Sequence, residues 1–250
     1  MVNIAINGIG RIGKLALKIL VSNNVNVKYI NELNGNPSNL LHSLEFDSIH
    51  GKWIADFKAN DNSININERA IRTTFYNNIE DMDLNDIDIV IDCTGVNNNK
   101  AALKKYFEQG IKKVIVSAPI NEENVANIAY GINHQTYIPS KHNIITAASC
   151  TTNCIAPIIK VLHENIGINH GSITTIHNLT NSQTLVDVPH NNLRRGRSAV
   201  NNLIPTTPSP NFVLPLPLKS VFQAISKSGL FAILNSPFLL TISNPIFSLR

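Results

Sequence analysis

The chain has 250 residues, of which 43% are hydrophobic and 15% are charged, and its formal net charge is +4 at pH 7. This length suffices for one large domain or two modest ones with a buried core. So small a charge excludes the strongly basic footprint of a nucleic-acid-binding protein, three cysteines exclude a disulfide framework, and no uninterrupted apolar stretch is long enough for a membrane span.

The first 33 residues predict one βαβ unit of a parallel sheet. Residues 2–7 (VNIAIN) read as a short buried strand, and residues 8–13 (GIGRIG) read as a glycine turn. Residues 14–24 have the apolar spacing of a helix, and residues 25–33 (VNVKYINEL) read as a second strand. This order of elements is typical of a domain that binds a dinucleotide.

Gly8, Gly10 and Gly13 match the pattern G-x-G-x-x-G between that strand and that helix. The three glycines allow a tight turn, a close approach of a pyrophosphate and close packing of the helix on the strand. An acidic residue about 20 positions further on binds the ribose hydroxyls of NAD, and Glu32 stands there. We therefore predict NAD as the cofactor. The alternative is a glycine turn that serves packing alone.

Residues 86–149 continue the alternation of strands and helices. Residues 86–95 read as a strand, residues 99–110 as a helix that ends at a glycine, and residues 112–118 and 142–149 as two further strands. Such alternation predicts an α/β fold with a doubly wound parallel sheet over residues 1–149.

From Cys150 onward the pattern changes. Residues 152–167 read as a helix and residues 170–180 as a strand, followed by an irregular stretch over residues 178–202. We therefore expect a second domain, of the α+β type, to begin at Cys150.

The segment SCTTNC places Cys150 and Cys154 four residues apart. A metal site needs further ligands with suitable spacing, and a dithiol redox pair usually has C-x-x-C spacing. A nucleophile is the third alternative, because Cys150 lies at a strand-to-helix junction, where the helix dipole favours the thiolate. His177, at the end of a predicted strand, is the candidate base. Cys154 is expected to be a small core residue.

Five stretches of the chain resemble phosphorylating glyceraldehyde-3-phosphate dehydrogenases: INGIGRIGKLALK, HSLEFDSIHGKW, SCTTNCIAPIIKVLHENIGI, GSITTIHNLTNSQTLVD and LRRGRSAVNNLIPTT. The resemblance covers residues 2–207, and SCTTNC is its most specific part. It implies that residues 150–207 begin an α+β catalytic domain that is incomplete in this chain. The stretches INELNG, LEFDSIHGKW and GINHGSITTIH further resemble a branch associated with an arsenical efflux permease. That branch implies arsenate in place of phosphate and 1-arseno-3-phosphoglycerate as the product.

The resemblance also implies roles for single residues. Cys150 would attack the aldehyde of glyceraldehyde 3-phosphate, and His177 would assist proton transfer and stabilise the tetrahedral oxygen. The remaining implied positions are Arg11 and Ile12 at the cofactor pyrophosphate, Glu32 at the adenine ribose, Ser117 near the nicotinamide, and Ser149, Thr151, Thr180 and Arg197 at the substrate phosphate and the attacking phosphate or arsenate. Residues 178–202 would form a loop at a subunit interface of a homo-oligomer. No metal is implied.

Two departures from the family accompany these matches. Ser182 stands where glycolytic members have an aspartate, which implies a different fit to the substrate. A glycolytic or erythrose-4-phosphate dehydrogenase is the alternative function within the family. After Thr207 the resemblance ends: residues 208–250 hold six prolines and no Asp or Glu. We expect a shifted or misassigned reading frame there, and an inactive remnant is then a further alternative.

The cysteine content and the first residues predict a location. Three cysteines in a chain of this length fit a reducing compartment. The start MVNIAINGIG has neither a basic segment nor a long apolar core, so we expect no signal peptide. We therefore predict a cytoplasmic protein without nucleic-acid or membrane partners.

Overall fold

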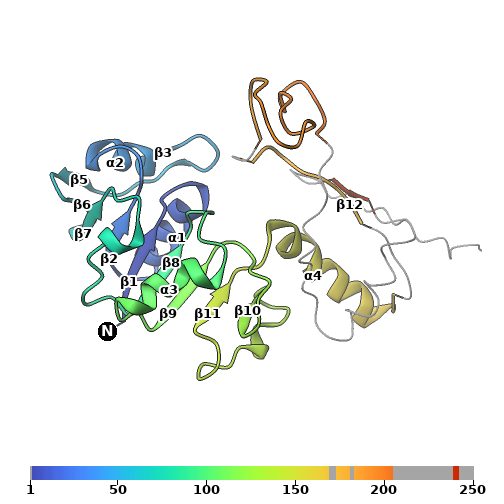
Figure 1. The fold of residues 1–250 in the computed structure, drawn as a ribbon, viewed down its shortest axis with the longest axis horizontal. Helices are drawn as coiled ribbons and strands as arrows, with labels where there is room; N and C mark the ends of the chain where they lie inside the picture. The colour runs from blue at the N-terminus through green and yellow to red at the C-terminus, as the bar shows by residue number, and fades with distance from the viewer. Residues whose placement is uncertain (1, 169–172, 181–182, 205–238, 242–250) are drawn as a thin grey trace, which may run out of the picture. The chain divides into compact units, whose positions relative to one another are not determined.

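The computed structural model describes residues 2–168, 173–180, 183–204 and 239–241 (Figure 1). The chain divides into two compact units, Met1–Ser149 and Cys150–Arg250. Each unit is described by itself below.

The first unit is built on a nine-stranded sheet. In sheet order its strands are β10 (Val125–Asn127), β11 (Ile144–Thr146), β9 (Lys113–Val116), β8 (Ile89–Asp92), β1 (Asn3–Asn7), β2 (Asn26–Asn31), β7 (Arg69–Thr74), β6 (Ser63–Ile66) and β5 (Phe57–Asn60). Every pairing from β10 to β7 is parallel, whereas β6 and β5 pair antiparallel. The predicted α/β fold with a mostly parallel sheet is therefore confirmed, with an antiparallel edge that the sequence analysis missed.

Helices cover both faces of this sheet. Side chains alternate between the two faces along a strand, and Ala5 and Ile6, which are both fully buried, belong to two different hydrophobic clusters. The Ile6 cluster includes Leu17 of α1 (Arg11–Ser22) and Leu40 of α2 (Pro37–Glu45). The Ala5 cluster includes Leu103 and Tyr106 of α3 (Lys100–Glu108). Burial on both faces explains why the middle residues of β1 and β8 are apolar.

Local sequence signals set the ends of the shorter elements. Asn36 caps α2 by accepting a hydrogen bond from the amide of Asn39, and Pro37 occupies the first helical position. Asn67 and Glu68, both with positive φ, form the two-residue turn between β6 and β7. The remaining elements of this unit are the hairpin of β3 (Phe46–Asp47) and β4 (Gly51–Lys52) and the 3₁₀ turns η1 (Ile79–Asp81) and η2 (His134–Thr136).

The second unit contains helix α4 (Cys150–Asn165) and strand β12 (Thr174–Ile176), which pairs antiparallel with β13 (Leu239–Thr241). Helix α4 begins two residues earlier than the sequence predicted, so Cys150 itself is its first residue. Within the described part of the predicted strand 170–180, only β12 is extended and paired. Residues 183–204 form a loop without helix or strand. Ser182 and most of residues 208–250 lie outside the described residues.

Candidate active site

The glycine turn after β1 has two glycines that packing requires. Gly8 has a φ of +88°, and a Cβ there would lie 2.8 Å from the backbone of Cys93 and Thr94. A Cβ on Gly13 would lie 1.9 Å from the carbonyl oxygen of Gly8. The packing alternative raised by the sequence therefore accounts for these two glycines.

Packing does not account for Gly10. Its φ is −74°, which any residue adopts, and a Cβ there would have no atom within 4 Å. Gly10 is the N-cap of α1, and no side chain caps the helix at this point. The absent side chain leaves open space in front of the first amides of α1, where an anionic pyrophosphate fits both the space and the positive end of the helix dipole.

Glu32 lies at the end of β2, directly beside the glycine turn. Its carboxylate accepts a hydrogen bond of 2.6 Å from the amide of Ile9 and a longer one of 3.4 Å from the amide of Asn34. Its own amide donates to the carbonyl oxygen of Thr74. Backbone amides therefore hold the carboxylate at the position where the ribose of NAD is expected.

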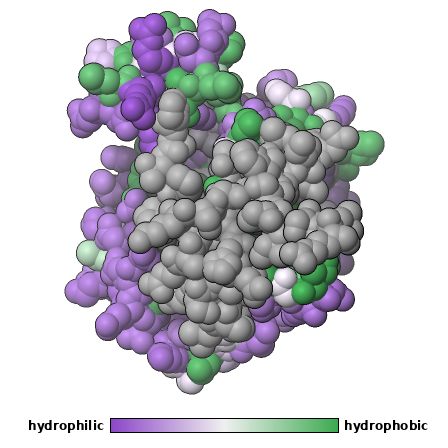
Figure 2. Space-filling view, turned by 90° about the vertical axis from the view of Figure 1, so that its right-hand side faces the viewer, coloured by the Kyte–Doolittle hydropathy of each residue, from purple (hydrophilic) through white to green (hydrophobic). Residues whose placement is uncertain are grey.

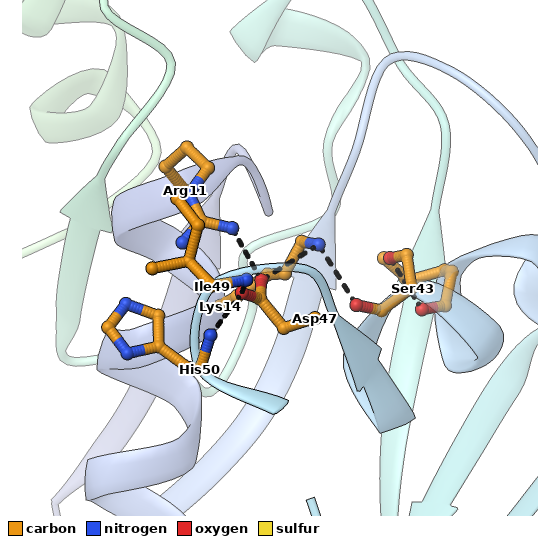
Figure 3. A network of polar contacts seen from close by, with 7 residues as sticks. Arg11, Lys14, Ser43, Asp47, Ile49 and His50 are labelled. Atoms are coloured by element: carbon orange, nitrogen blue, oxygen red, sulfur yellow. Dashed lines mark hydrogen bonds and ion pairs between the residues drawn. The ribbon is translucent and has the colours of Figure 1, made fainter. Parts of the chain in front are cut away.

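The side chain of Arg11 lies in a cluster around Asp47, shown in Figure 3. The Arg11 guanidinium and one Asp47 carboxylate oxygen are 2.5 Å apart, and the other oxygen accepts bonds from the amides of Ile49 and His50. Lys14 lies 3.6 Å from the same carboxylate. These partners, the His50 amide first and Arg11 next, hold the pKa of Asp47 well below its usual range.

This cluster changes the expected role of Arg11. Its guanidinium is engaged by the β3–β4 hairpin, so Arg11 and Ile12 are best placed to meet a pyrophosphate through their backbone amides at the start of α1. Ile12, the second residue of α1, is 57% exposed. Sequence reasoning missed Asp47, although the quoted stretch HSLEFDSIHGKW contains it.

Ser117 follows β9 directly, and its amide donates to the carbonyl oxygen of Asp92. Its hydroxyl bonds to the Cys93 thiol, whose pKa is raised to about 11 mainly by burial. Gly8, Glu32, Cys93 and Ser117 thus follow four neighbouring parallel strands, β1, β2, β8 and β9. Strand order reverses beside β1, and in such sheets ligands bind outside the carboxyl ends of the strands at this place.

Within the second unit, Cys150 and His177 are in contact. The Cys150 sulfur lies 3.2 Å from Nε2 of His177, and the cysteine is exposed at the first position of α4. Nδ1 of His177 lies 2.6 Å from the carbonyl oxygen of Asn178. A carbonyl oxygen only accepts, so Nδ1 carries the proton and Nε2 of the neutral ring presents its lone pair to the thiol. The pair has the geometry of a nucleophile and its base.

The other predicted anion-binding residues lie at the start of α4 and in the loops that follow β12. Thr151 is the second residue of α4, and Ser149 directly precedes the helix. The amide of Thr180 donates to the side chain of Gln183. The Arg197 guanidinium pairs with Asp187 at 2.6 Å, so among the described contacts it belongs to loop 183–204. Cys154 is half-buried on α4.

Two other kinds of site are absent from the described residues. No group of three or more His, Cys, Asp or Glu side chains there could hold a metal ion. None of the described helices is both long and apolar enough to cross a membrane.

Comparison with known proteins decides the family. Residues 2–100 match the NAD binding domain of glyceraldehyde 3-phosphate dehydrogenase, and residues 149–213 match its C-terminal domain. The chain belongs to the glyceraldehyde-3-phosphate dehydrogenase family. The cofactor prediction, NAD, agrees with the matched domain, and the second match extends six residues past Thr207, where we expected it to end.

Single members of the family give the same result. Glyceraldehyde-3-phosphate dehydrogenase 3 of Nostoc sp. is 45% identical over 209 residues, which are 82% of this chain and 62% of the relative. Glyceraldehyde-3-phosphate dehydrogenase 1 of Bacillus cereus is 40% identical over 83% of this chain and 62% of the relative. The enzyme of Geobacillus stearothermophilus is 40% identical over 82% and 62%. The matched part of the chain thus spans about three fifths of these relatives.

Proposed function

We propose that the chain oxidises glyceraldehyde 3-phosphate with NAD through a thioester on Cys150, and that inorganic phosphate or arsenate releases the product. The 3.2 Å contact between the Cys150 sulfur and Nε2 of His177 carries this proposal. The family membership and the open glycine turn of the first unit support it.

The first step follows from the His177 tautomer. Nε2 accepts the thiol proton of Cys150, and the resulting thiolate is stabilised by the imidazolium and by the first amides of α4. The thiolate attacks the aldehyde carbon, and the imidazolium returns the proton to the carbonyl oxygen, which gives a thiohemiacetal. The backbone amides at the start of α4 are placed to stabilise negative charge on that oxygen.

The later steps conserve the energy of the oxidation. Bound NAD supplies the acceptor for a hydride from the thiohemiacetal carbon. His177 takes the hydroxyl proton as the hydride leaves, so a thioester remains on Cys150. An oxygen of the inorganic anion then attacks the thioester carbon, and the Cys150 thiolate leaves as the acyl phosphate or acyl arsenate forms.

The choice of anion belongs to this proposal as well. The stretches INELNG and LEFDSIHGKW support the arsenate branch through resemblance, with Thr151, Thr180 and Arg197 as the candidate ligands. Comparing steady-state rates with arsenate and with phosphate tests the branch. A rate that is higher with phosphate at equal concentration would favour the glycolytic alternative, whereas arsenate preference would support arsenic detoxification.

A second candidate is a module that binds the cofactor without turnover. The observation that favours it is that residues 214–250 lie beyond both family matches. Binding of NAD to the chain without any NADH formation would support this candidate.

The deciding experiment measures NADH formation from glyceraldehyde 3-phosphate, NAD and either anion. We expect Cys150→Ser to abolish the activity, because the hydroxyl is a far weaker nucleophile at neutral pH. Cys154→Ser, one helical turn further on, is the matched control and should retain activity. Activity that survives in Cys150→Ser would refute the proposed function.

A further inference from the structure

A series of buried polar side chains runs beneath the carboxyl ends of β2, β1 and β8. Asn7, Asn31, Asp92 and Tyr106 are at most 5% exposed. Asn31 donates to Asn7, Asn7 donates to the Tyr106 hydroxyl at 2.6 Å, and that hydroxyl donates to Asp92 at 2.8 Å. We call these four residues the Asp92 network. Local sequence patterns do not reveal this network, because it joins residues that are 14 to 99 positions apart.

Asp92 organises the loop that follows β8. Its carboxylate accepts bonds from the amide and the hydroxyl of Thr94 and from the side chain of Asn97 at 2.7 Å. These bonds fold residues 93–97 back over the end of the strand. The backbone of Cys93 and Thr94 in turn fills the space that a Cβ on Gly8 would need. The loop and the glycine turn are therefore in direct contact.

The charge of Asp92 is balanced by hydrogen bonds. No Lys or Arg of the described residues forms an ion pair with it. Burial, followed by the Asp92 charge, raises the pKa of Tyr106, so this phenol stays protonated and donates. A buried carboxylate without a cation is costly unless its hydrogen bonds are made. The Tyr106 hydroxyl is one of the donors that make this arrangement stable.

Space filling alone does not require a tyrosine at this position. A phenylalanine would occupy the same place among Val90, Leu103 and Val114 in the hydrophobic cluster. What the hydroxyl adds is a bridge between Asn7, the residue before the glycine turn, and Asp92, the residue before loop 93–97. Both segments lie at the strand-order reversal where the dinucleotide is expected.

We propose that Tyr106 is a positioning residue for the cofactor, whose hydroxyl fixes loop 93–97 against the glycine turn and thereby sets the affinity for NAD. This inference rests on one part of the proposed function, the binding of NAD at this edge of the sheet. Tyr106 itself does not touch the cofactor, because it is fully buried on α3 beneath the edge.

The first test compares two buried tyrosines of one hydrophobic cluster. Tyr106→Phe removes the bridge, and we expect the dissociation constant for NAD to rise about tenfold, the effect of losing one hydrogen bond to a charged group. Tyr29→Phe is the matched control: Tyr29 is also fully buried, and its hydroxyl bonds to Thr74. Thr74 donates to Asn31 at the far end of the Asp92 network, so this variant leaves the bridge from Asn7 to Asp92 intact. We expect its dissociation constant to stay within about twofold of the wild type.

Binding is measured by titration calorimetry at a temperature where circular dichroism shows each variant fully folded. A loss of stability alone does not change the dissociation constant of a fully folded chain. In steady state, Tyr106→Phe should raise KM for NAD and leave KM for glyceraldehyde 3-phosphate unchanged.

A second pair of variants tests the loop from its exposed side. Asn97→Ala removes a donor to Asp92 and should weaken NAD binding, whereas Asn99→Ala removes only the N-cap of α3 and should not. The inference is overturned if both Tyr106→Phe and Asn97→Ala bind NAD like the wild type, or if the controls weaken binding equally. NAD binding without NADH formation would refute the proposed function instead, and a wild type that binds no NAD would refute both.

Discussion

The two ring nitrogens of His177 have different partners, and this difference gives the residue its proposed role. The Asn178 carbonyl oxygen holds the proton on Nδ1, so Nε2 presents its lone pair to the thiol of Cys150. An exposed thiol beside such a base should react rapidly with alkylating reagents.

We predict that His177→Asn lowers the alkylation rate of Cys150 by iodoacetamide at pH 7 about 100-fold, the usual contribution of a positioned base. The rate is followed by mass spectrometry of the labelled Cys150 peptide. His163→Asn is the control, because His163 lies on the same helix as Cys150 and bonds to the amide of Ile168. Equal rates in the wild type and His177→Asn would contradict the assigned base.

Asp47 shows how a single carboxylate couples folding to pH. Its pKa in the folded chain is well below its ordinary value of 3.8, because the His50 and Ile49 amides and Arg11 favour the charged form. A lowered pKa stabilises the folded chain at pH values above the pKa of the unfolded state. This stabilisation is lost as the pH falls toward the pKa of the folded state.

For Asp47→Asn we therefore expect a lower Tm than the wild type at pH 7. The difference should shrink as the pH is lowered below about 4, where the unfolded chain takes up the proton. Thermal melts at several pH values measure it, with the exposed carboxylate variant Asp61→Asn as the control. A constant Tm difference from pH 7 to pH 2.5 would show that Asp47 acts through something other than its charge.

At the scale of elements, the glycine turn contains glycines that folding requires and one glycine that folding does not require. Gly13 must be glycine because a Cβ would overlap the Gly8 carbonyl, whereas the space in front of Gly10 is open. The same turn thus contains one position for packing and one that fits a ligand.

Gly13→Ala should destabilise the fold by about 3 kcal/mol, as overpacking does in a region that cannot relax. Gly10→Ala should destabilise the fold by only about 1 kcal/mol, because alanine is a poorer N-cap than glycine, yet weaken NAD binding because the methyl group occupies the space for the pyrophosphate. Denaturant unfolding and calorimetric titration measure the two effects. If Gly10→Ala binds NAD normally, the pyrophosphate does not lie at the start of α1.

At the scale of the whole molecule, the loop of residues 183–204 supports the proposed homo-oligomer. The carbonyl oxygen of Gly196 accepts a hydrogen bond from the amide of Val188, so the loop folds back on itself. Its apolar side chains nevertheless remain exposed, among them Leu193 at 84% and Leu203 at 90%. Hydrophilic and hydrophobic residues are interspersed over the loop at the top of Figure 2. Exposed apolar side chains also occur singly on monomeric proteins, so the oligomer stays a prediction that the family resemblance implies.

We predict that Leu193→Asp shifts the chain toward the monomer in size-exclusion chromatography with light scattering, because a charge in an apolar interface is costly. Ile54→Asp is the control, since Ile54 is 91% exposed in the first unit, outside the loop. A wild type that is monomeric at every concentration would exclude the oligomer. The cytoplasmic location likewise remains a prediction.

The sequence by itself determined the α/β class and the βαβ unit with its glycine turn. It also determined the candidate nucleophile, Cys150, and the candidate base, His177. These features depend on short-range patterns: alternation of strands and helices, spacing of glycines, and residue types around one cysteine. The short strands β5, β6 and β10 and helix α2 escaped prediction, because few apolar residues mark them and their pairing is set by distant neighbours.

Only the tertiary structure decided which side chains meet. Asp47 engages the guanidinium of Arg11, Asp187 engages Arg197, and Tyr106 joins Asn7 to Asp92. Nothing in the local sequence distinguishes these carboxylates and amides from solvated ones. Asn7, Tyr106 and Asp92 meet because a parallel sheet brings the carboxyl ends of distant strands to one edge, where burial makes every hydrogen bond necessary. The other two pairs form at the β3–β4 hairpin and in the exposed loop 183–204.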